Sequence, residues 1–140
     1  MNIKRGDICI AALDPVVGKE ISKTRPVVII SNDKNNSFSG TVTILPITSK
    51  NLKKIYPFEV FLPKGSGSLP KDSKVKADQI RTLDKSRIVA ILGKLGENEV
   101  KSVERALKIH LALGVWGRGS EDRVQTTEDR FRIANFEFRI

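Results

Sequence analysis

The chain has 140 residues, the size of one ordinary domain, and 39% of them are hydrophobic, enough for a packed core. Its 25 Lys and Arg residues outnumber 16 Asp and Glu residues, which gives a formal net charge of +9. The single cysteine and histidine, Cys9 and His110, exclude an intramolecular disulfide and a Cys/His zinc cage within one chain. No apolar run approaches the roughly 18 residues of a membrane helix, and the N-terminus has no signal-peptide pattern. We therefore expect a basic, cytoplasmic protein with no membrane partner.

The excess positive charge lies in the first part of the chain. Residues 1–116 carry 20 basic and 11 acidic side chains, whereas residues 117–140 carry five of each. A surplus of this size favours a polyanionic partner, because binding to phosphates releases their condensed counterions. Nucleic acid is the leading candidate, and a basic surface that serves only solubility is the alternative.

Short runs rich in Val, Ile and Phe alternate with turn-forming clusters through the first two-thirds of the chain, which predicts β-strands. Such strands in a small chain favour a strongly curved antiparallel sheet or a small barrel. Pro46 predicts that the third strand ends at an edge or a bulge, because proline has no N–H to donate. The expected strands cover residues 7–13, 26–31, 41–47, 57–62, 74–77 and 87–92, and residues 32–40 are expected to be a turn.

An amphipathic helix is expected after these strands. Residues 98–113 carry apolar side chains at three- and four-residue spacing. Asn98 is the expected N-cap and Gly114 the expected stop. His110 falls within the apolar stripe, where packing in the core or at a subunit contact is favoured over a catalytic or ligand role.

The final segment, residues 117–140, forms an extension beyond this helix. Residues 131–133 and 136–140 alternate apolar and charged side chains, which is the period of a half-buried strand. Such a segment can pair with a sheet edge of its own chain or of a partner, or it can be partly disordered. We therefore divide the chain into a domain of residues 1–116 and an extension of unknown role.

Polar side chains gather where the expected strands end. In a small curved sheet the ends of neighbouring strands converge, so one basic cleft lined by hydroxyl and amide groups is feasible. The pattern alone is weak, because Arg and Thr at loop edges are ordinary surface residues. The residues concerned are Lys19, Glu20, Lys23 and Arg25 around the first connection, Thr48, Ser49 and Lys50 after the third strand, and Asp78, Gln79 and Arg81 after the fifth.

Six motifs follow one another along the chain. They are RGDI at residues 5–8, LDPVVGKE at 13–20, TRPVVIISND at 24–33, LPITS at 45–49, YPFEV at 56–60 and ADQIRTLDK at 77–85. With the closing helix, this ordered series resembles the MazF/PemK family, the toxins of bacterial toxin–antitoxin pairs. The resemblance covers roughly residues 1–116, and the order of the motifs makes chance agreement improbable.

The resemblance implies a mainly β fold, a Src-homology-3-like barrel closed by a helix, and usually a homodimer. It also implies a ribosome-independent endoribonuclease that acts on single-stranded RNA, and a cognate antitoxin whose acidic segment covers the basic groove. The family's catalytic arginine and threonine correspond to Arg25 and Thr48. The RNA-binding residues that follow from it are Lys19, Glu20, Lys23, Ser49, Lys50, Asp78 and Gln79.

The implied chemistry fits the residue types. The 2′-hydroxyl of RNA can attack the adjacent phosphorus and leave a 2′,3′-cyclic phosphate and a 5′-hydroxyl, so neither a metal nor a cofactor is expected. Arg25 offers a planar fork of donors for the charge that builds on the phosphoryl oxygens, and Thr48 can donate its hydroxyl to the same phosphate. The base is unassigned: a guanidinium stays protonated, and Glu20 either accepts the 2′-hydroxyl proton or orients Arg25.

Structural alternatives remain for these residues. Arg25 can pair with Glu20 or Asp78 at the surface, and Thr48 can cap a turn. Contact with phosphate and simple solvation are equally open for the lysines at 53, 54, 71, 74 and 76.

The alternative function is a binding protein without nuclease activity: a toxin of similar fold that acts on DNA gyrase, or an RNA-binding module. Retention of both Arg25 and Thr48 favours the enzyme. Residues 117–140 depart from the family pattern, whose members usually end near the helix. Our hypothesis is that this extension adds an edge strand and leaves the active site free.

Overall fold

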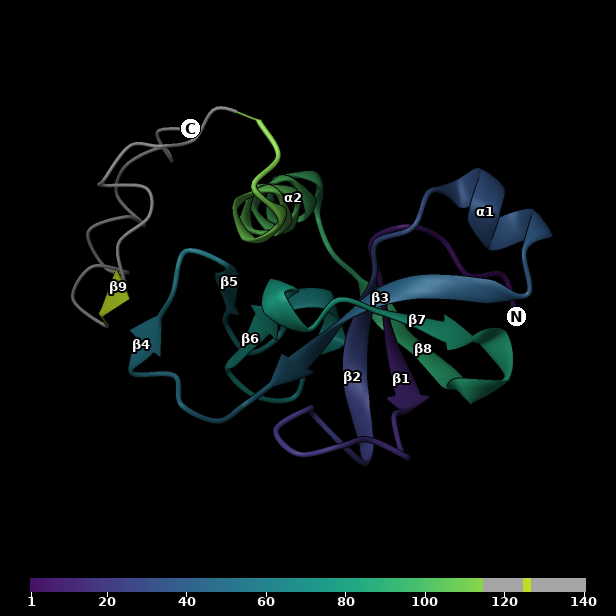
Figure 1. The fold of residues 1–140 in the computed structure, drawn as a ribbon, viewed down its shortest axis with the longest axis horizontal. Coiled ribbons are helices and arrows are strands. Elements are labelled where there is room, and N and C mark those ends of the chain that lie inside the picture. The colour runs from purple at the N-terminus through teal and green to yellow at the C-terminus, as the bar shows by residue number, and fades with distance from the viewer. Residues whose placement is uncertain (115–124, 127–140) are drawn as a thin grey trace.

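A twisted antiparallel sheet and one long helix dominate the computed structural model, which describes residues 1–114 and the backbone of Gln125–Thr126 (Figure 1). The expectation of a mainly β fold with a closing helix is confirmed. The helices are α1 (Asp33–Phe38) and α2 (Glu97–Leu111), with 3-10 turns η1 (Ser66–Ser68), η2 (Ala77–Gln79) and η3 (Lys85–Arg87). The strands are β1 (Asp7–Ala12), β2 (Thr24–Ile29), β3 (Thr41–Thr48), β4 (Lys54–Ile55), β5 (Glu59–Leu62), β6 (Ser73–Lys76), β7 (Arg81–Asp84), β8 (Ile88–Lys94) and β9 (Gln125–Thr126).

The main sheet has the strand order β5-β6-β3-β2-β1-β8, and β7 pairs with the first half of β3. Strand β3 pairs with β7 as far as Ile44 and with β6 from Ile47 onwards. The prediction that the Pro46 end of this strand lies at a sheet edge or a bulge is wrong, because β3 continues to Thr48 as a central strand between β2 and β6. Pro46 lies between the residues that pair with β7 and those that pair with β6, so on that edge its missing N–H interrupts neither ladder.

Both faces of the central strands are buried, which explains why β2 reads as a continuous apolar run and not as an alternation. On one face α2 lies over the sheet (Figure 1), and its Val103 and Ala106 belong to the buried layer between them. The residues of the sheet in this layer include Ile8, Val28, Leu45, Ile47, Leu62 and Val75. The layer on the opposite face includes Cys9, Ala11, Val27, Ile29, Ile44, Leu83 and Ile88.

Several short elements were not expected from the sequence. Strands β4 and β7 are too short and too polar to stand out as apolar runs. Helix α1 lies in the segment expected to be a turn, where the Asn32 side chain accepts a hydrogen bond from the Asn35 amide at 2.8 Å and so caps the helix.

The ends of α2 differ slightly from the expected ones. Its N-cap is Gly96, two residues before the expected Asn98, and Glu99 Oε1 accepts from the Gly96 amide at 2.8 Å. The helix ends at Leu111, and its C-cap Ala112, two residues before Gly114, adopts a left-handed conformation (φ 57°). His110 is exposed, with its ring centroid 6.2 Å from that of Phe58.

Part of the C-terminal extension pairs with the body of the protein. Strand β9 runs antiparallel to β4, with Thr126 opposite Lys54 and Gln125 opposite Ile55. The strands expected at residues 131–133 and 136–140 lie outside the described residues. Within residues 1–114, no helix is long and apolar enough to cross a membrane.

The backbone of η1 passes close to β8 at Gly93, so we expect Gly93→Ala to destabilise the fold. A Cβ at this position would lie 2.3 Å from the Gly67 carbonyl oxygen. The expected loss is about 1–3 kcal/mol in the free energy of unfolding, the usual cost of overpacking, measured by urea denaturation. Gly40→Ala is the control, because a Cβ at Gly40 meets no atom within 4 Å. Equal stability of the two variants would contradict this close approach.

Candidate active site

Arg25 and Thr48 lie at the ends of neighbouring strands. The β2–β3 ladder pairs Val27 with Pro46, Val28 with Leu45 and Ile29 with Ile44. Continued by two residues, the same register sets Arg25 opposite Thr48, just beyond the last ladder pair. Because residues opposite each other in an antiparallel pair share a face of the sheet, the two side chains belong to the same face.

The guanidinium of Arg25 is held on one side and open on the other. Its Nε donates to the Ser22 carbonyl oxygen at 3.1 Å, and the side chain is half-buried. Within residues 1–114, neither Glu20 nor Asp78 forms an ion pair with it. The structural alternative, an ion pair of Arg25 with Glu20 or Asp78, is therefore not formed within these residues. The N–H groups of the two terminal nitrogens can donate to a ligand.

Thr48 is the last residue of β3 and is also half-buried. Its Oγ1 accepts a hydrogen bond from the Lys50 amide at 3.2 Å, so the side chain does cap a turn, as the structural alternative proposed. A hydroxyl that accepts one hydrogen bond can still donate its proton. Capping the turn and donating to a ligand are therefore compatible roles.

The loop between β1 and β2 is tied at its base and at its far side. The Leu13 amide donates to the Lys23 carbonyl at 2.9 Å, and the Ile21 amide donates to Gln79 Oε1 at 2.8 Å. Gln79 thus joins this loop to η2. Lys23 adopts a left-handed conformation (φ 69°), which closes the loop into β2.

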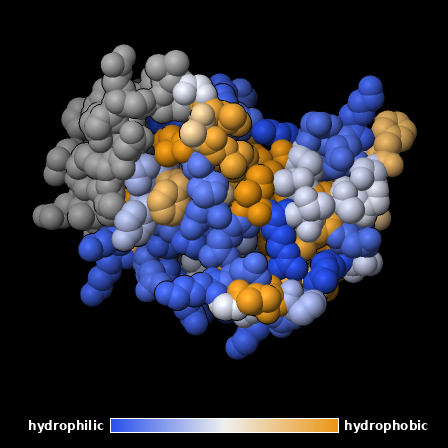
Figure 2. Space-filling model, viewed as in Figure 1, coloured by the Kyte–Doolittle hydropathy of each residue, from blue (hydrophilic) through white to orange (hydrophobic). Residues whose placement is uncertain are grey.

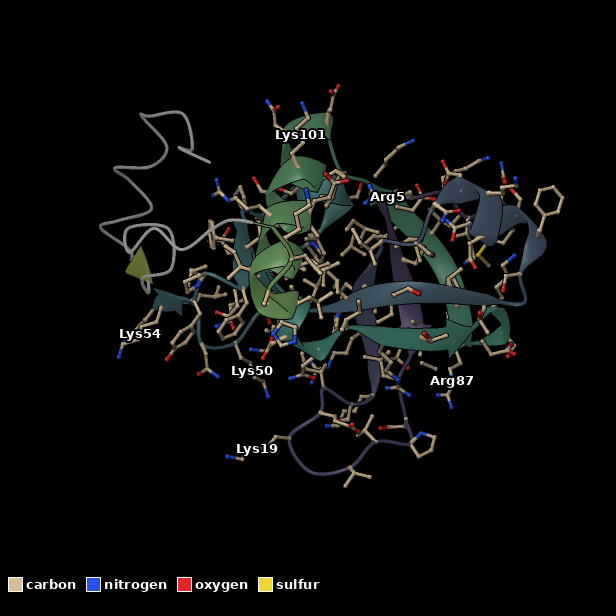
Figure 3. The ribbon with its side chains drawn as sticks, turned by 45° about the horizontal axis from the view of Figure 1, so that its top comes forward. Arg5, Lys19, Lys50, Lys54, Arg87 and Lys101 are labelled. Carbon is tan, nitrogen blue, oxygen red and sulfur yellow. The ribbon has the colours of Figure 1, made fainter. Side chains whose placement is uncertain are left out.

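The remaining predicted residues differ in their surroundings. Glu20 Oε1 accepts from the Val17 amide at 2.7 Å, so its carboxylate is engaged within its own loop. Asp78 Oδ1 lies 3.6 Å from Lys76 Nζ. Figure 3 shows Lys19 and Lys50 projecting from the same side of the molecule, from the β1–β2 loop and from the segment after β3.

Solvent-facing polar groups dominate the end of the sheet where β3 stops. In Figure 2 the part of the surface below α2 is mostly hydrophilic, over the ends of β2 and β3 and the β1–β2 loop. Lys19, Ser49 and Lys50 are exposed there. The end of the sheet that bears Arg25 and Thr48 therefore presents a basic, hydrophilic surface.

A buried ion network adjoins this surface, and sequence analysis did not identify it. Lys74 Nζ lies 3.0 Å from Glu59 Oε1, and Lys76 Nζ lies 2.6 Å from Glu59 Oε2. Lys74, left open between phosphate contact and solvation, is a structural lysine, because its side chain is only 5% exposed. The available signal was opposite charges at same-face positions of two short consecutive strands, EVFL and SKVK.

The network keeps Lys76 protonated. Burial of the ammonium acts to lower its pKa, but the hydrogen bond and the charge of Glu59, with a smaller contribution from Asp78, raise the pKa above its ordinary value. Because Lys76 Nζ also lies 3.6 Å from Asp78 Oδ1, the two lysines are balanced by two carboxylates. The positive potential at this end of the sheet therefore comes from the exposed lysines around the network.

Cys9 is not suited to act as a nucleophile. It is buried in the layer opposite α2, and burial raises the pKa of its thiol to about 12, with the charge of Asp7 acting in the same direction. The thiol therefore stays protonated at neutral pH, whereas the thiolate is the reactive form.

The fold and the site together define a small basic β-protein with an open arginine and a threonine hydroxyl at one end of its sheet, suited to bind a phosphodiester. Residues 4–111 match the family described as PemK-like, MazF-like toxin of type II toxin–antitoxin system. The chain belongs to this family.

Curated relatives and solved structures agree with this assignment. The chain is 42% identical over 111 residues to the endoribonuclease MazF of Staphylococcus saprophyticus, with 79% of this chain and 92% of the relative covered. It is 37% identical over 116 residues to the endoribonuclease MazF9 of Mycobacterium tuberculosis, with 79% and 98% covered. A crystal structure of MazF from Deinococcus radiodurans has a TM-score of 0.69 at 28% identity, with 80% of this chain and 98% of that chain covered.

The link between Gln79 and the β1–β2 loop yields a prediction. Replacing Gln79 with Leu removes the acceptor of the Ile21 amide, so we expect this amide to exchange its hydrogen about fivefold faster, which corresponds to a lost hydrogen bond of roughly 1 kcal/mol. Hydrogen exchange followed by NMR measures it. The Leu13 amide, bonded to a backbone carbonyl at the base of the same loop, is the internal control. Unchanged exchange at Ile21 would contradict this role of Gln79.

Proposed function

We propose that this chain is the toxin of a toxin–antitoxin pair and that it cleaves single-stranded RNA as an endoribonuclease, thereby stopping translation and growth. The observation that carries the proposal is the shared register and face of Arg25 and Thr48, with the terminal nitrogens of Arg25 not engaged by Glu20 or Asp78. Residues 1–116 are the catalytic domain in this proposal, and the activity is cytoplasmic, where messenger RNA is translated.

The cleavage begins when the 2′-hydroxyl of one nucleotide attacks its own 3′-phosphorus. A new P–O bond forms and the bond to the 5′-oxygen of the next nucleotide breaks. The 2′-hydroxyl loses a proton and the leaving 5′-oxygen gains one, so the products carry a 2′,3′-cyclic phosphate and a 5′-hydroxyl. Arg25 donates two hydrogen bonds to the phosphoryl oxygens, on which negative charge accumulates. Thr48 donates a hydrogen bond from its hydroxyl to the same phosphate and holds the phosphate in line for the attack.

RNA binding extends beyond these two residues in the proposal. Lys19, Lys23 and Lys50 contact backbone phosphates on either side of the cleaved bond, and Ser49, Asp78 and Gln79 contact the bases or riboses. Glu20, engaged with the Val17 amide, maintains the shape of the loop that presents these lysines.

Two protein partners complete the proposal. An antitoxin with an acidic segment neutralises the toxin by covering the basic end of the sheet. A second copy of the chain forms a homodimer, and a support for it is the apolar surface at the end of α2, where Leu111 and Leu113 are 42% and 54% exposed (Figure 2).

The first test is cleavage of a long single-stranded RNA by purified protein in excess EDTA. Wild type is expected to cut it and to leave cyclic-phosphate and 5′-hydroxyl ends. Arg25→Ala is expected to lose at least 100-fold in rate, because it removes charge stabilisation from the transition state. The matched control is Lys34→Ala, an exposed cation on α1, far from the end of β3 in Figure 1.

Three other outcomes of this test would each contradict a part of the proposal. Intact RNA under conditions in which the protein still arrests cell growth would exclude the nuclease and favour binding to DNA gyrase. Equal cleavage by wild type and by Arg25→Ala would place the active site elsewhere or reveal a contaminating nuclease. Cleavage that stops on addition of EDTA would contradict the metal-independent mechanism.

The role of Thr48 has its own test. Thr48→Val preserves the shape of the side chain and removes the hydroxyl, so the rate is expected to fall about 10- to 100-fold, the value of one hydrogen bond to a charged group. Thr43→Val, on the same strand but among the residues that pair with β7, is the control and should cleave at the wild-type rate. A Thr48→Val variant within twofold of wild type would remove Thr48 from the mechanism.

A further inference from the structure

The buried lysine Lys74 is the ladder partner of Thr48. Strand β6 pairs antiparallel with β3, with Lys74 opposite Thr48 and Val75 opposite Ile47. Val75 and Ile47 face α2, so Lys74 and Thr48 share the opposite face of the sheet. A buried lysine therefore lies beside the proposed catalytic hydroxyl.

The ammonium of Lys74 is bonded to the segment that follows Thr48. Its Nζ donates to the Asn51 carbonyl at 2.9 Å, to the Lys54 carbonyl at 3.3 Å and to Glu59 Oε1 at 3.0 Å. An ammonium has three donors, and these partners account for all of them. Asn51 itself adopts a left-handed conformation (φ 57°), so the lysine holds a tight turn at its most constrained residue.

The carboxylate of Glu59 holds the ammonium of Lys74 in place. The carboxylate is 1% exposed, and it accepts from Lys76 Nζ at 2.6 Å and from the Tyr56 amide at 3.1 Å as well as from Lys74. Glu59 lies on β5 directly opposite Lys76 in the β5–β6 ladder. The anchor of the turn is thus built on two paired strands, which are more rigid than a loop.

The turn that Lys74 holds also orients the hydroxyl of Thr48. The Lys50 amide donates to Thr48 Oγ1 at 3.2 Å, which occupies one acceptor position of the hydroxyl. With the amide fixed at this position, the hydroxyl proton points away from it. The direction of that proton therefore depends on where residues 49–54 lie.

We infer that Glu59 and Lys74 are positioning residues for RNA cleavage: they hold residues 49–54 so that Thr48 presents its hydroxyl proton, and Lys50 its ammonium, to the scissile phosphate. The inference rests on the proposed function. Neither residue touches RNA, because both side chains are almost completely buried. A buried ion pair adds little stability over an apolar pair of the same size, so stability alone does not account for this choice of residues.

The test uses the double variant Lys74→Met/Glu59→Gln, which removes the donors to the turn and leaves no unpaired buried carboxylate. The substrate is an RNA oligonucleotide that contains the strongest cleavage site mapped in a long transcript. We expect kcat to fall at least tenfold, KM to stay within threefold, and the amides of residues 49–54 to exchange faster. The matched control is Lys64→Met, which changes an exposed lysine two residues after the end of β5. It should match wild type in all three measurements.

Results that contradict the inference differ from those that contradict the proposed function. A double variant with wild-type kcat, or with KM raised and kcat unchanged, would overturn the positioning role while wild type still cleaves. An absence of cleavage by wild type would overturn the proposed function itself. If the double variant does not fold, Glu59→Gln, which keeps an acceptor for Lys74 and for the Tyr56 amide, replaces it. Its kcat should fall three- to tenfold, and an unchanged kcat would overturn the inference.

Discussion

The register of β3 against its two neighbours determines where the chemistry of this protein lies. On one edge the β2 register leads from Thr48 to Arg25, and on the other edge the β6 ladder pairs Thr48 with Lys74. A slip by one residue would move every side chain of β3 to the opposite face, so the Thr48 hydroxyl would point towards α2. The apolar layers on both faces prevent such a slip, because Leu45 and Ile47 fit one layer and Ile44 the other. The packing of the core on both faces of β3 therefore also fixes the position of the site residues.

Two kinds of positive charge meet at this end of the sheet. Lys19 and Lys50 face solvent, where they contribute to attraction of a polyanion and are screened by salt. The pair formed by Lys74 and Lys76 is largely shielded from water and is balanced by the carboxylates of Glu59 and Asp78. The exposed charges can move to follow a flexible RNA strand, whereas the buried charges stay where the strands place them.

Much of this organisation could be predicted from the sequence. Apolar runs located most strands of the main sheet to within a few residues, and three- and four-residue spacing located α2, because periodicity reports burial directly. Strand β7 was missed because it is short and polar, and the Glu59–Lys74 network was missed because the register that brings these charges together does not show in the apolar pattern. Pro46 misled the prediction, since a local rule cannot indicate that β3 changes its pairing partner at that residue.

The candidate pair Arg25 and Thr48 came from a resemblance in motif order, and its geometry came from the register. The pairing of β9 with β4 concerns the same region, since β4 begins where the turn held by Lys74 ends. Residues 125–126 follow the main sheet and α2 in the chain, and domains begin to fold from the N-terminal side during synthesis. During translation the strands of the main sheet and α2 are therefore made before β9. The turn beside Thr48 thus receives its outer strand only after the chain has passed through all the elements that surround the site.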